Sequence, residues 1–162
     1  MMNIRYVHTN IVAKDWGFIA DFYENALNCT RLEPSLDIGG KWLADGTGVP
    51  DARLTGIHLR FPGYGDNAPT LEIFQYVEQL ERPEPSAANR PGYGHLAFEV
   101  GDVEAVRSQI LAHGGKDLGV PVTHKLEGHG TIIFTYMTDP EGNVIELQSW
   151  DGVSRYGAVD AA

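Results

Sequence analysis

The sequence predicts an α+β fold made of two copies of one module, and two observations lead to this prediction. The segment Tyr6-Val7-His8 returns as Tyr93-Gly94-His95, and each histidine is followed seven residues later by an aspartate that opens a helical pattern. Each half then ends on a strand-like segment with one glutamate between aliphatic residues, Leu71-Glu72-Ile73 and Ile145-Glu146-Leu147. Each half therefore has the order strand, helix and further strands.

The repeat also predicts how the chain is divided. Residues 1–77 form the first module and residues 93–150 the second, within one domain overall. The segment 78–92 contains three prolines and has the composition of a linker. Residues 151–162 form a tail without a clear pattern.

The first module begins with a strand at residues 4–12. Asp15 is a suitable N-cap for a helix that runs to about Asn28. The apolar positions of this helix have helical spacing, and they are Trp16, Ile19, Phe22, Tyr23 and Ala26.

The segment 34–52 is rich in glycine, proline and aspartate. This composition predicts a mobile loop with a short strand at Lys41-Trp42-Leu43. The stretch between histidine and glutamate is longer in the first copy than in the second, and we expect the extra residues to form a lid from this loop. Strands follow near 53–61 and 70–77, joined by a turn at 62–67.

The second module begins with a strand at 94–100 and a helix at 103–113 that Asp102 opens and Gly114-Gly115 ends. Strands near 131–138 and 143–149 follow. Between them, Asp139-Pro140-Glu141-Gly142-Asn143 is a strong hairpin turn signal.

Strand alternation predicts that four residues of the repeat share one environment. His8, Glu72, His95 and Glu146 each lie opposite the aliphatic face of their strand, which should carry the helices. Two imidazoles and two carboxylates are suitable ligands for a divalent metal. The alternative is that they are ordinary surface residues, since a lone histidine or glutamate on a strand usually binds no metal.

Composition excludes several classes of function. The net charge of −10 argues against nucleic acid as a partner. No run approaches the roughly 18 apolar residues of a membrane span. The segment from Met1 to Tyr6 lacks the apolar core of a signal peptide, and the single cysteine, Cys29, cannot form an internal disulfide, so we expect a cytoplasmic protein.

The chain resembles the vicinal oxygen chelate superfamily, which includes glyoxalase I, methylmalonyl-CoA epimerase, extradiol dioxygenases, fosfomycin resistance proteins and bleomycin-binding proteins. The resemblance covers residues 4 to 150. The matching segments are Tyr6-Val7-His8-Thr9-Asn10-Ile11-Val12, Phe18-Ile19-Ala20-Asp21-Phe22-Tyr23, Gly94-His95-Leu96-Ala97-Phe98-Glu99-Val100 and Asp139-Pro140-Glu141-Gly142-Asn143-Val144-Ile145-Glu146-Leu147.

The resemblance implies two βαβββ modules that form an incomplete barrel around a metal-centred cavity, often in a homodimer. It implies His8, Glu72, His95 and Glu146 as ligands, a set that looks like that of glyoxalase I. The expected activity is that of a lyase or isomerase acting on a small oxygen-chelating substrate through an enediolate-type intermediate. Ni²⁺, Co²⁺, Zn²⁺ or Mn²⁺ would stabilise that intermediate, and Glu72 or Glu146 would move the proton.

Two departures from the glyoxalase I pattern put glutathione recognition in doubt. Four residues after the first histidine, glyoxalase I typically has an arginine that helps to hold glutathione, and here that position is Val12. Four residues after the first glutamate it commonly has an asparagine, and here that position is Tyr76.

Two other functions remain open. An extradiol-type dioxygenase would bind Fe²⁺ through His8, His95 and Glu146 and would leave Glu72 without a role. A drug-sequestering member of the superfamily would bind a small molecule without catalysis, and such members generally lack the metal ligands.

Further residues are candidates for the site or for ordinary packing. His58 and Arg60 lie on the polar face of the strand 53–61, where Arg60 could hold an anionic substrate group and His58 could move protons. Aromatic side chains could form a cavity wall, namely Trp42, Tyr64, Phe74, Tyr76 and Tyr136. We expect His113 and His124 at the surface, His129 in a loop that could reach the site, and Cys29 to be buried or inert.

Overall fold

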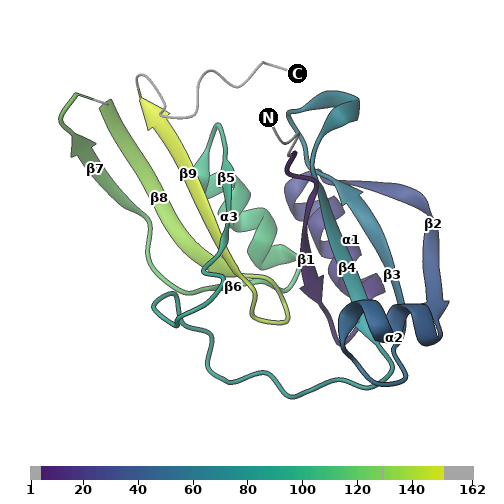
Figure 1. The fold of residues 1–162 in the computed structure, drawn as a ribbon. Helices are drawn as coiled ribbons and strands as arrows, with labels where there is room; N and C mark the ends of the chain where they lie inside the picture. The colour runs from purple at the N-terminus through teal and green to yellow at the C-terminus, as the bar shows by residue number, and fades with distance from the viewer. Residues whose placement is uncertain (1–4, 129, 152–162) are drawn as a thin grey trace. The chain divides into compact units, whose positions relative to one another are not determined.

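The computed structural model describes residues 5–128 and 130–151 of the chain. The chain divides into two compact units, residues 1–82 and residues 83–162, and each contains one open mixed sheet (Figure 1). The first unit consists of β1 (His8–Val12), α1 (Trp16–Leu27), β2 (Thr30–Gly39), α2 (Lys41–Thr47), β3 (Arg53–Arg60), a short 3₁₀ turn (Gly65–Asn67) and β4 (Thr70–Tyr76). The second consists of β5 (Leu96–Glu99), α3 (Val103–Ala112), β6 (Lys116–Asp117), β7 (Val122–Leu126), β8 (Gly130–Thr138) and β9 (Val144–Asp151).

The first helix begins and ends where its sequence predicts. The Asp15 carboxylate accepts a hydrogen bond from the Phe18 amide at 3.0 Å, which satisfies an N–H that the helix leaves unpaired. Asn28 ends α1 in the left-handed conformation at φ 55°. Of the predicted apolar positions, Trp16 is half-buried and the other four are buried against β3 and β4.

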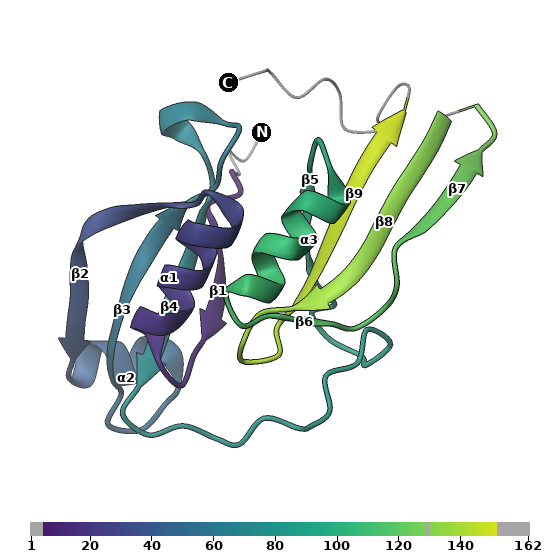
Figure 2. The same cartoon turned by 180° about the vertical axis from the view of Figure 1, so that it is seen from behind.

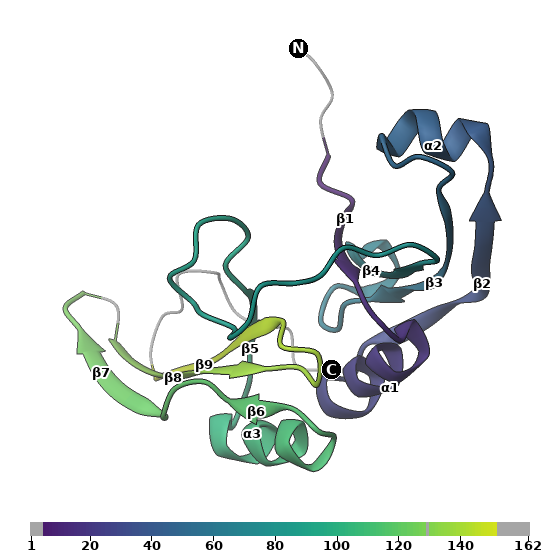
Figure 3. The ribbon, with the colours of Figure 1, turned by 90° about the horizontal axis from the view of Figure 1, so that it is seen from below.

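The first sheet has the order β1-β4-β3-β2, with β1 parallel to β4 and the other pairs antiparallel. Leu71 and Ile73 of the central strand β4 are fully buried on the face that α1 covers. Glu72, Phe74 and Tyr76 alternate with them and lie on the opposite face. The two helices of this unit lie on opposite sides of the sheet (Figure 3), so α1 covers the aliphatic face and α2 one end of the polar face.

The prediction of a mobile loop at 34–52 is wrong, and so is the short strand at residues 41–43. Residues 30–39 form the edge strand β2, where the pairing shifts between Leu32 and Leu36 and accommodates Pro34. Residues 41–47 form the helix α2, which buries Leu43 against Ala52 and Leu54. Gly40 and Gly48 mark the two ends of the helix, and the loop that would have formed a lid does not exist.

The second sheet has the order β5-β9-β8-β6, and β7 also pairs with β8. Its first strand is again parallel to its last, β5 with β9. Asp102 opens α3 by accepting hydrogen bonds from the Glu104 and Ala105 amides at 2.9 and 3.0 Å. Figure 2 shows α1 and α3, each against the sheet of its own unit. The strands β6 and β7 are not predicted by the sequence, because their residues are mostly exposed and lack an apolar alternation.

The predicted hairpin turn between β8 and β9 is confirmed, and a buried carboxylate holds it together. Asp139 is fully buried and accepts hydrogen bonds from the Asn143 backbone amide at 2.8 Å, the Asn143 side chain at 2.6 Å and the Glu141 amide at 3.0 Å. Burial raises the pKa of Asp139 above its ordinary value, although these hydrogen bonds act in the opposite direction.

The segment 78–92 contains neither helix nor strand, and side-chain hydrogen bonds hold it at Gln79 and at Ser86. The Gln79 side chain donates to the Ala13 carbonyl at 2.8 Å in the first unit, and the Ser86 hydroxyl donates to the Gly142 carbonyl at 2.6 Å in the second. The boundary between the units lies between Arg82 and Pro83.

The predicted α+β fold is confirmed, because each unit contains a strand, a helix and further strands in one mixed sheet. Two strands begin later than predicted. Within the described residues the first strand begins at His8, and the strand expected at 94–100 begins at Leu96. His8 therefore opens β1, and His95 immediately precedes β5. The tail 152–162 lies outside the described residues.

Candidate metal and substrate site

The first unit brings His8 and Glu72 together on the face of the sheet opposite α1. Glu72 is the register partner of Asn10, two residues beyond His8 on the parallel neighbour β1. The His8 Nε2 atom lies 3.3 Å from the Glu72 Oε2 atom. Glu72 is only 9% exposed, so its carboxylate depends on protein partners rather than on water.

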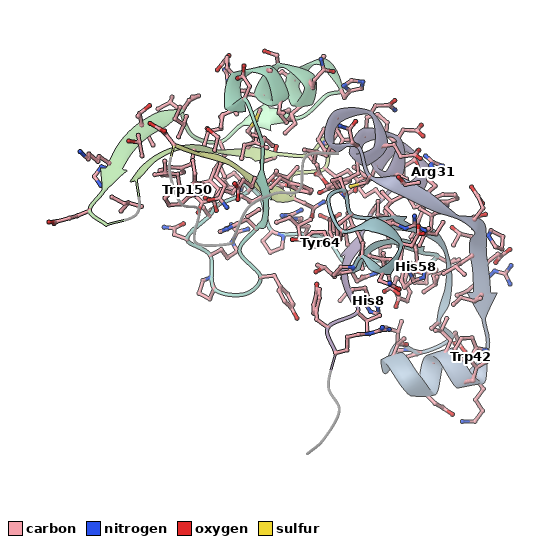
Figure 4. All side chains as sticks on the ribbon, turned by 90° about the horizontal axis from the view of Figure 1, so that it is seen from above. His8, Arg31, Trp42, His58, Tyr64 and Trp150 are labelled. Carbon is pink, nitrogen blue, oxygen red and sulfur yellow. The ribbon has the colours of Figure 1, made fainter. Side chains whose placement is uncertain are left out.

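A second imidazole faces the other oxygen of Glu72. His58 is the register partner of Glu72 on β3, and its Nε2 atom lies 3.5 Å from the Glu72 Oε1 atom. The Asn10 side-chain amide donates to Glu72 Oε2 at 3.5 Å. His8 and His58 lie near one another in Figure 4, with ring centroids 6.4 Å apart. Glu72 is therefore in contact with three polar side chains from the two strands that flank it.

The second unit repeats this arrangement with two differences, at the positions of Asn10 and His58. The His95 Nε2 atom lies 2.9 Å from the Glu146 Oε2 atom. Glu146 pairs with Ala97, two residues beyond His95, and with Tyr136 on the other side. Tyr136 therefore occupies the position that His58 has in the first unit, and its ring centroid lies 5.0 Å from that of His95. Burial, followed by the charge of Glu146, raises the pKa of Tyr136, which favours the neutral phenol.

The spacing within each pair fits two ligands of one metal ion. Two donor atoms that each bind an ion at about 2.1 Å, at right angles, lie about 3.0 Å apart, and the two pairs are separated by 3.3 and 2.9 Å. Imidazole nitrogen and carboxylate oxygen together suit zinc and other divalent transition metals. Within residues 5–128 and 130–151, no three histidine, cysteine, aspartate or glutamate side chains are already grouped around a point that could hold an ion.

Arg60 lies two residues beyond His58 on β3 and already has an anionic partner. Its guanidinium donates to the Asp66 carboxylate at 2.9 Å, in the turn that joins β3 to β4. A substrate anion would have to compete with this exposed carboxylate. The expected role of Arg60 in holding substrate stays a prediction.

The aromatic candidates of the first unit have different surroundings. Phe74 and Tyr76 pack against the buried cluster of Leu43, Ala52 and Leu54 below α2. Trp42 and Tyr64 are 65% and 71% exposed, so they do not line an enclosed wall within their unit. The aromatic residues predicted as one wall therefore include two that pack under α2 and two at the surface.

Tyr136, in contrast, lines a pocket within the second unit. This β7–β9 pocket has a volume of about 580 Å³. Its apolar lining consists of Val122, Leu126, Ile132 and Phe134. Its polar lining consists of Thr123, His124, Tyr136 and Glu146.

Sequence reasoning missed Asn10 and most of the pocket residues. The position of Asn10, two residues beyond His8 on the polar face, was the available signal for its contact with Glu72. The pocket depends on β7, for which the sequence gives no strand pattern, so no signal pointed to Val122 or Leu126. His124 is exposed, as predicted, whereas His113 is half-buried at the C-cap of α3, and His129 lies outside the described residues.

Cys29 is 5% exposed, which confirms the prediction that it is buried. Burial, assisted by the charge of Glu24, raises the pKa of its thiol to about 12. A thiol with this pKa is almost entirely protonated at neutral pH and is a poor nucleophile and a poor metal ligand. Cys29 therefore takes no part in the candidate site.

Residues 5–147 match the family model of the Glyoxalase/Bleomycin resistance protein/Dioxygenase superfamily. A lactoylglutathione lyase of Neisseria meningitidis is 27% identical over 144 residues, 89% of this chain and 89% of that protein. A probable lactoylglutathione lyase of Synechocystis is 30% identical over 111 residues, 68% of this chain and 78% of that protein. The crystal structure of a glyoxalase family protein from Bacillus cereus has the same fold, with a TM-score of 0.76 at 19% identity over 94% of this chain and 97% of that chain.

Proposed function

The chain belongs to the Glyoxalase/Bleomycin resistance protein/Dioxygenase superfamily, and from this premise we propose that it is a divalent-metal-dependent lyase or isomerase of the glyoxalase type. Its substrate would be a small molecule with two neighbouring oxygen atoms. The observation that carries the proposal is the repeated pair, His8 with Glu72 and His95 with Glu146, each at ligand spacing.

The proposal assigns both pairs to one ion, with His8, Glu72, His95 and Glu146 as its ligands. The equivalent register of the two pairs supports this assignment, because a repeated module presents the same two donors from each copy. Six-coordinate Ni²⁺, Co²⁺, Mn²⁺ or Zn²⁺ would accept these four donors and leave two positions for substrate oxygens. When bound, the ion would supply Lewis acidity to two neighbouring substrate oxygens.

The residues of the chain would supply the proton transfer. Glu72 or Glu146 would take a proton from one substrate carbon and return it to the neighbouring carbon. His58 and Asn10 would orient the Glu72 carboxylate, since both lie within 3.5 Å of its oxygens. Tyr136, as a neutral phenol beside Glu146, would donate a hydrogen bond on the other side of the site.

Two relatives are named lactoylglutathione lyase and probable lactoylglutathione lyase. These names support lyase chemistry, but they do not decide whether the substrate of this chain is attached to glutathione. Val12 takes the position where a glutathione-binding arginine is expected. It is 54% exposed, and its uncharged side chain cannot form an ion pair with a glutathione carboxylate. Tyr76 takes the position of an expected asparagine and packs beneath α2. We therefore propose the lyase or isomerase class, with glutathione dependence in doubt.

Metal stoichiometry tests the proposal directly. The protein is stripped with a chelator, reloaded with Zn²⁺ or Ni²⁺, and titrated by calorimetry beside the variants His8→Ala and His95→Ala. We expect one ion per four-ligand set, and a loss of affinity of at least tenfold in both variants, because each removes one ligand of the same ion. The matched control is His113→Ala, which removes the half-buried C-cap histidine of α3, outside the proposed ligand set, and should bind metal as the parent does.

Other results would contradict the proposal in distinct ways. Two ions per chain, with each variant losing only one, would mean that the pairs form separate sites. No metal binding after reloading would end the enzymatic hypothesis and favour a small-molecule binding protein. Iron in protein purified without chelators would favour the dioxygenase. A homodimer also remains a prediction, and sedimentation of the reloaded protein measures it.

A further inference from the structure

We propose that the β7–β9 pocket binds an uncharged apolar group of the substrate, such as an aryl or branched alkyl group, beside the oxygens that the metal would hold. This inference rests on the proposed function and deepens it by naming a substrate class. The substrate would be an oxygen-chelating molecule with an apolar substituent, rather than a conjugate of a charged peptide such as glutathione.

The size and lining of the pocket suit such a group. Its volume of about 580 Å³ lies within the usual range of small-molecule sites. Five aliphatic or aromatic side chains line it, and two of them, Phe134 and Tyr136, are arranged edge to face, with centroids 6.2 Å apart at 81°. An aromatic substituent could stack on this pair and remove apolar surface from water.

The pocket is continuous with the proposed chelating end of the site. Glu146 belongs to its lining and pairs in register with Tyr136. Along β8, Tyr136, Phe134 and Ile132 follow in steps of two residues on the same face. These steps carry the lining about 13 Å away from Glu146. A substrate with its oxygens near Glu146 could therefore extend its substituent along β8.

The charges of the pocket argue against an anionic substituent. Among the described residues that line it, there is no lysine or arginine. Of the lining residues within 5–128 and 130–151, Glu146 is the one carboxylate and would repel an anion, and His124 is the one side chain that could carry a positive charge. A carboxylate placed among Val122, Ile132 and Phe134 would lose its hydration without gaining a counter-ion.

Three hydroxamates test the inference on the metal-loaded protein, because each presents the same two oxygens to a metal. Acetohydroxamate supplies only the chelating head, 4-phenylbenzohydroxamate adds an apolar substituent, and 4-(4-carboxyphenyl)benzohydroxamate ends that substituent in a carboxylate. Titration calorimetry gives the dissociation constants. We expect the phenyl compound to bind about 30-fold more tightly than acetohydroxamate. The carboxylate compound should bind about tenfold more weakly than the phenyl compound.

Two variants locate the effect. Phe134→Ala should weaken the phenyl compound by about tenfold and leave acetohydroxamate unchanged. Ile132→Arg should reverse the preference, so that the carboxylate compound binds more tightly than the phenyl compound, which a misfolded variant would not do. The matched control is Ile133→Ala, next to Ile132 on the same strand but on the opposite face, which should leave all three constants unchanged.

The outcomes separate this inference from the function on which it rests. Metal and acetohydroxamate binding without any gain from the phenyl substituent would overturn the pocket assignment and leave the proposed function intact. Absence of both metal and acetohydroxamate binding would overturn the proposed function itself. A gain from the substituent that Ile132→Arg and Phe134→Ala do not alter would place the apolar group elsewhere and reject the inference.

Discussion

At the scale of single residues, the two oxygens of Glu72 face different imidazoles. Oε2 lies 3.3 Å from His8 and Oε1 lies 3.5 Å from His58. One oxygen can therefore bind a metal beside His8 while the other is held by His58. Glu72 could therefore act as a metal ligand, as a base, or as both, and metal content and proton transfer measure these two roles separately.

Glu72→Gln tests the proton-transfer role with little change in size. If Glu72 is the base, we expect kcat to fall by about 10²–10⁴-fold, because the amide cannot accept the proton, while most of the metal is retained. The measurement is exchange of the substrate C–H hydrogen in D₂O, followed by NMR, beside metal content. The matched variant is Glu146→Gln, and unchanged turnover in either variant excludes that glutamate as the base.

Cys29 gives a residue-scale prediction with a pH dependence. Burial raises the pKa of its thiol to about 12, so the folded protein favours the protonated form over the range in which an unfolded thiol ionises. Stability should therefore fall as pH rises from about 9 towards 12. At pH 8 a disulfide reagent should react with the unfolded chain within minutes and with the folded chain hardly at all. Since the chain has one cysteine, rapid labelling of the folded protein would contradict the burial.

The sequence was sufficient to place His8, Glu72 and Glu146 opposite the aliphatic residues of their strands, because alternation along a strand is a local property. It was not sufficient to show that His58 and Tyr136 occupy equivalent positions beside Glu72 and Glu146. That equivalence depends on the register between β3 and β4 and between β8 and β9. Register is fixed by the pairing of whole strands and not by the residues of one segment.

At the scale of elements, capped helices were predictable and the segment 34–52 was not. Asp15 and Asp102 accept hydrogen bonds at the starts of α1 and α3, as their sequence context indicates. The helix α2 has only one buried residue, Leu43, and its N-cap makes no side-chain hydrogen bond. Leu43 packs against Leu54 and Phe74. These tertiary contacts stabilise the helix although the amino-acid composition of the segment favours a loop.

Gly56 of β3 allows the close approach of β4 beneath the polar face. A Cβ atom at this position would lie 2.3 Å from the Ile73 carbonyl oxygen and 2.7 Å from Phe74 Cδ1. We expect Gly56→Ala to lower the free energy of unfolding by about 1–3 kcal/mol, because the backbone must shift, as measured by urea denaturation.

Gly46→Ala provides the opposite case within α2. Apart from its chain neighbours and the backbone of its own helix, no atom of the described residues lies within 4 Å of the Cβ that this change adds. Alanine favours a helix over glycine, so we expect a gain of about 0.5–1 kcal/mol. Destabilisation by Gly46→Ala would contradict the assignment of residues 41–47 to a helix. A neutral Gly56→Ala would contradict the close contact with β4.

At the scale of the whole molecule, the repeat in the sequence predicted the repeat in the fold. Each unit has its first strand parallel to its last, and each places one histidine and one glutamate at ligand spacing. Within residues 5–128 and 130–151, no helix has both the length and the apolar composition needed to cross a bilayer. One ion with ligands from both units would couple the free energy of unfolding of the first unit to that of the second.

Amide hydrogen exchange measures this link. With free metal at about 100 times its dissociation constant, a shared ion should raise the free energy of opening by about 2.7 kcal/mol in both units. Peptides that contain β4 and β9 should therefore gain protection together. His95→Ala removes a ligand from the second unit alone, yet a tenfold loss of affinity should lower the gain to about 1.4 kcal/mol in β4 as well as in β9, and a larger loss should lower both further. The control His113→Ala should keep both gains. If His95→Ala removes protection from β9 while β4 keeps it, each unit holds its own ion, and the four residues do not form one site.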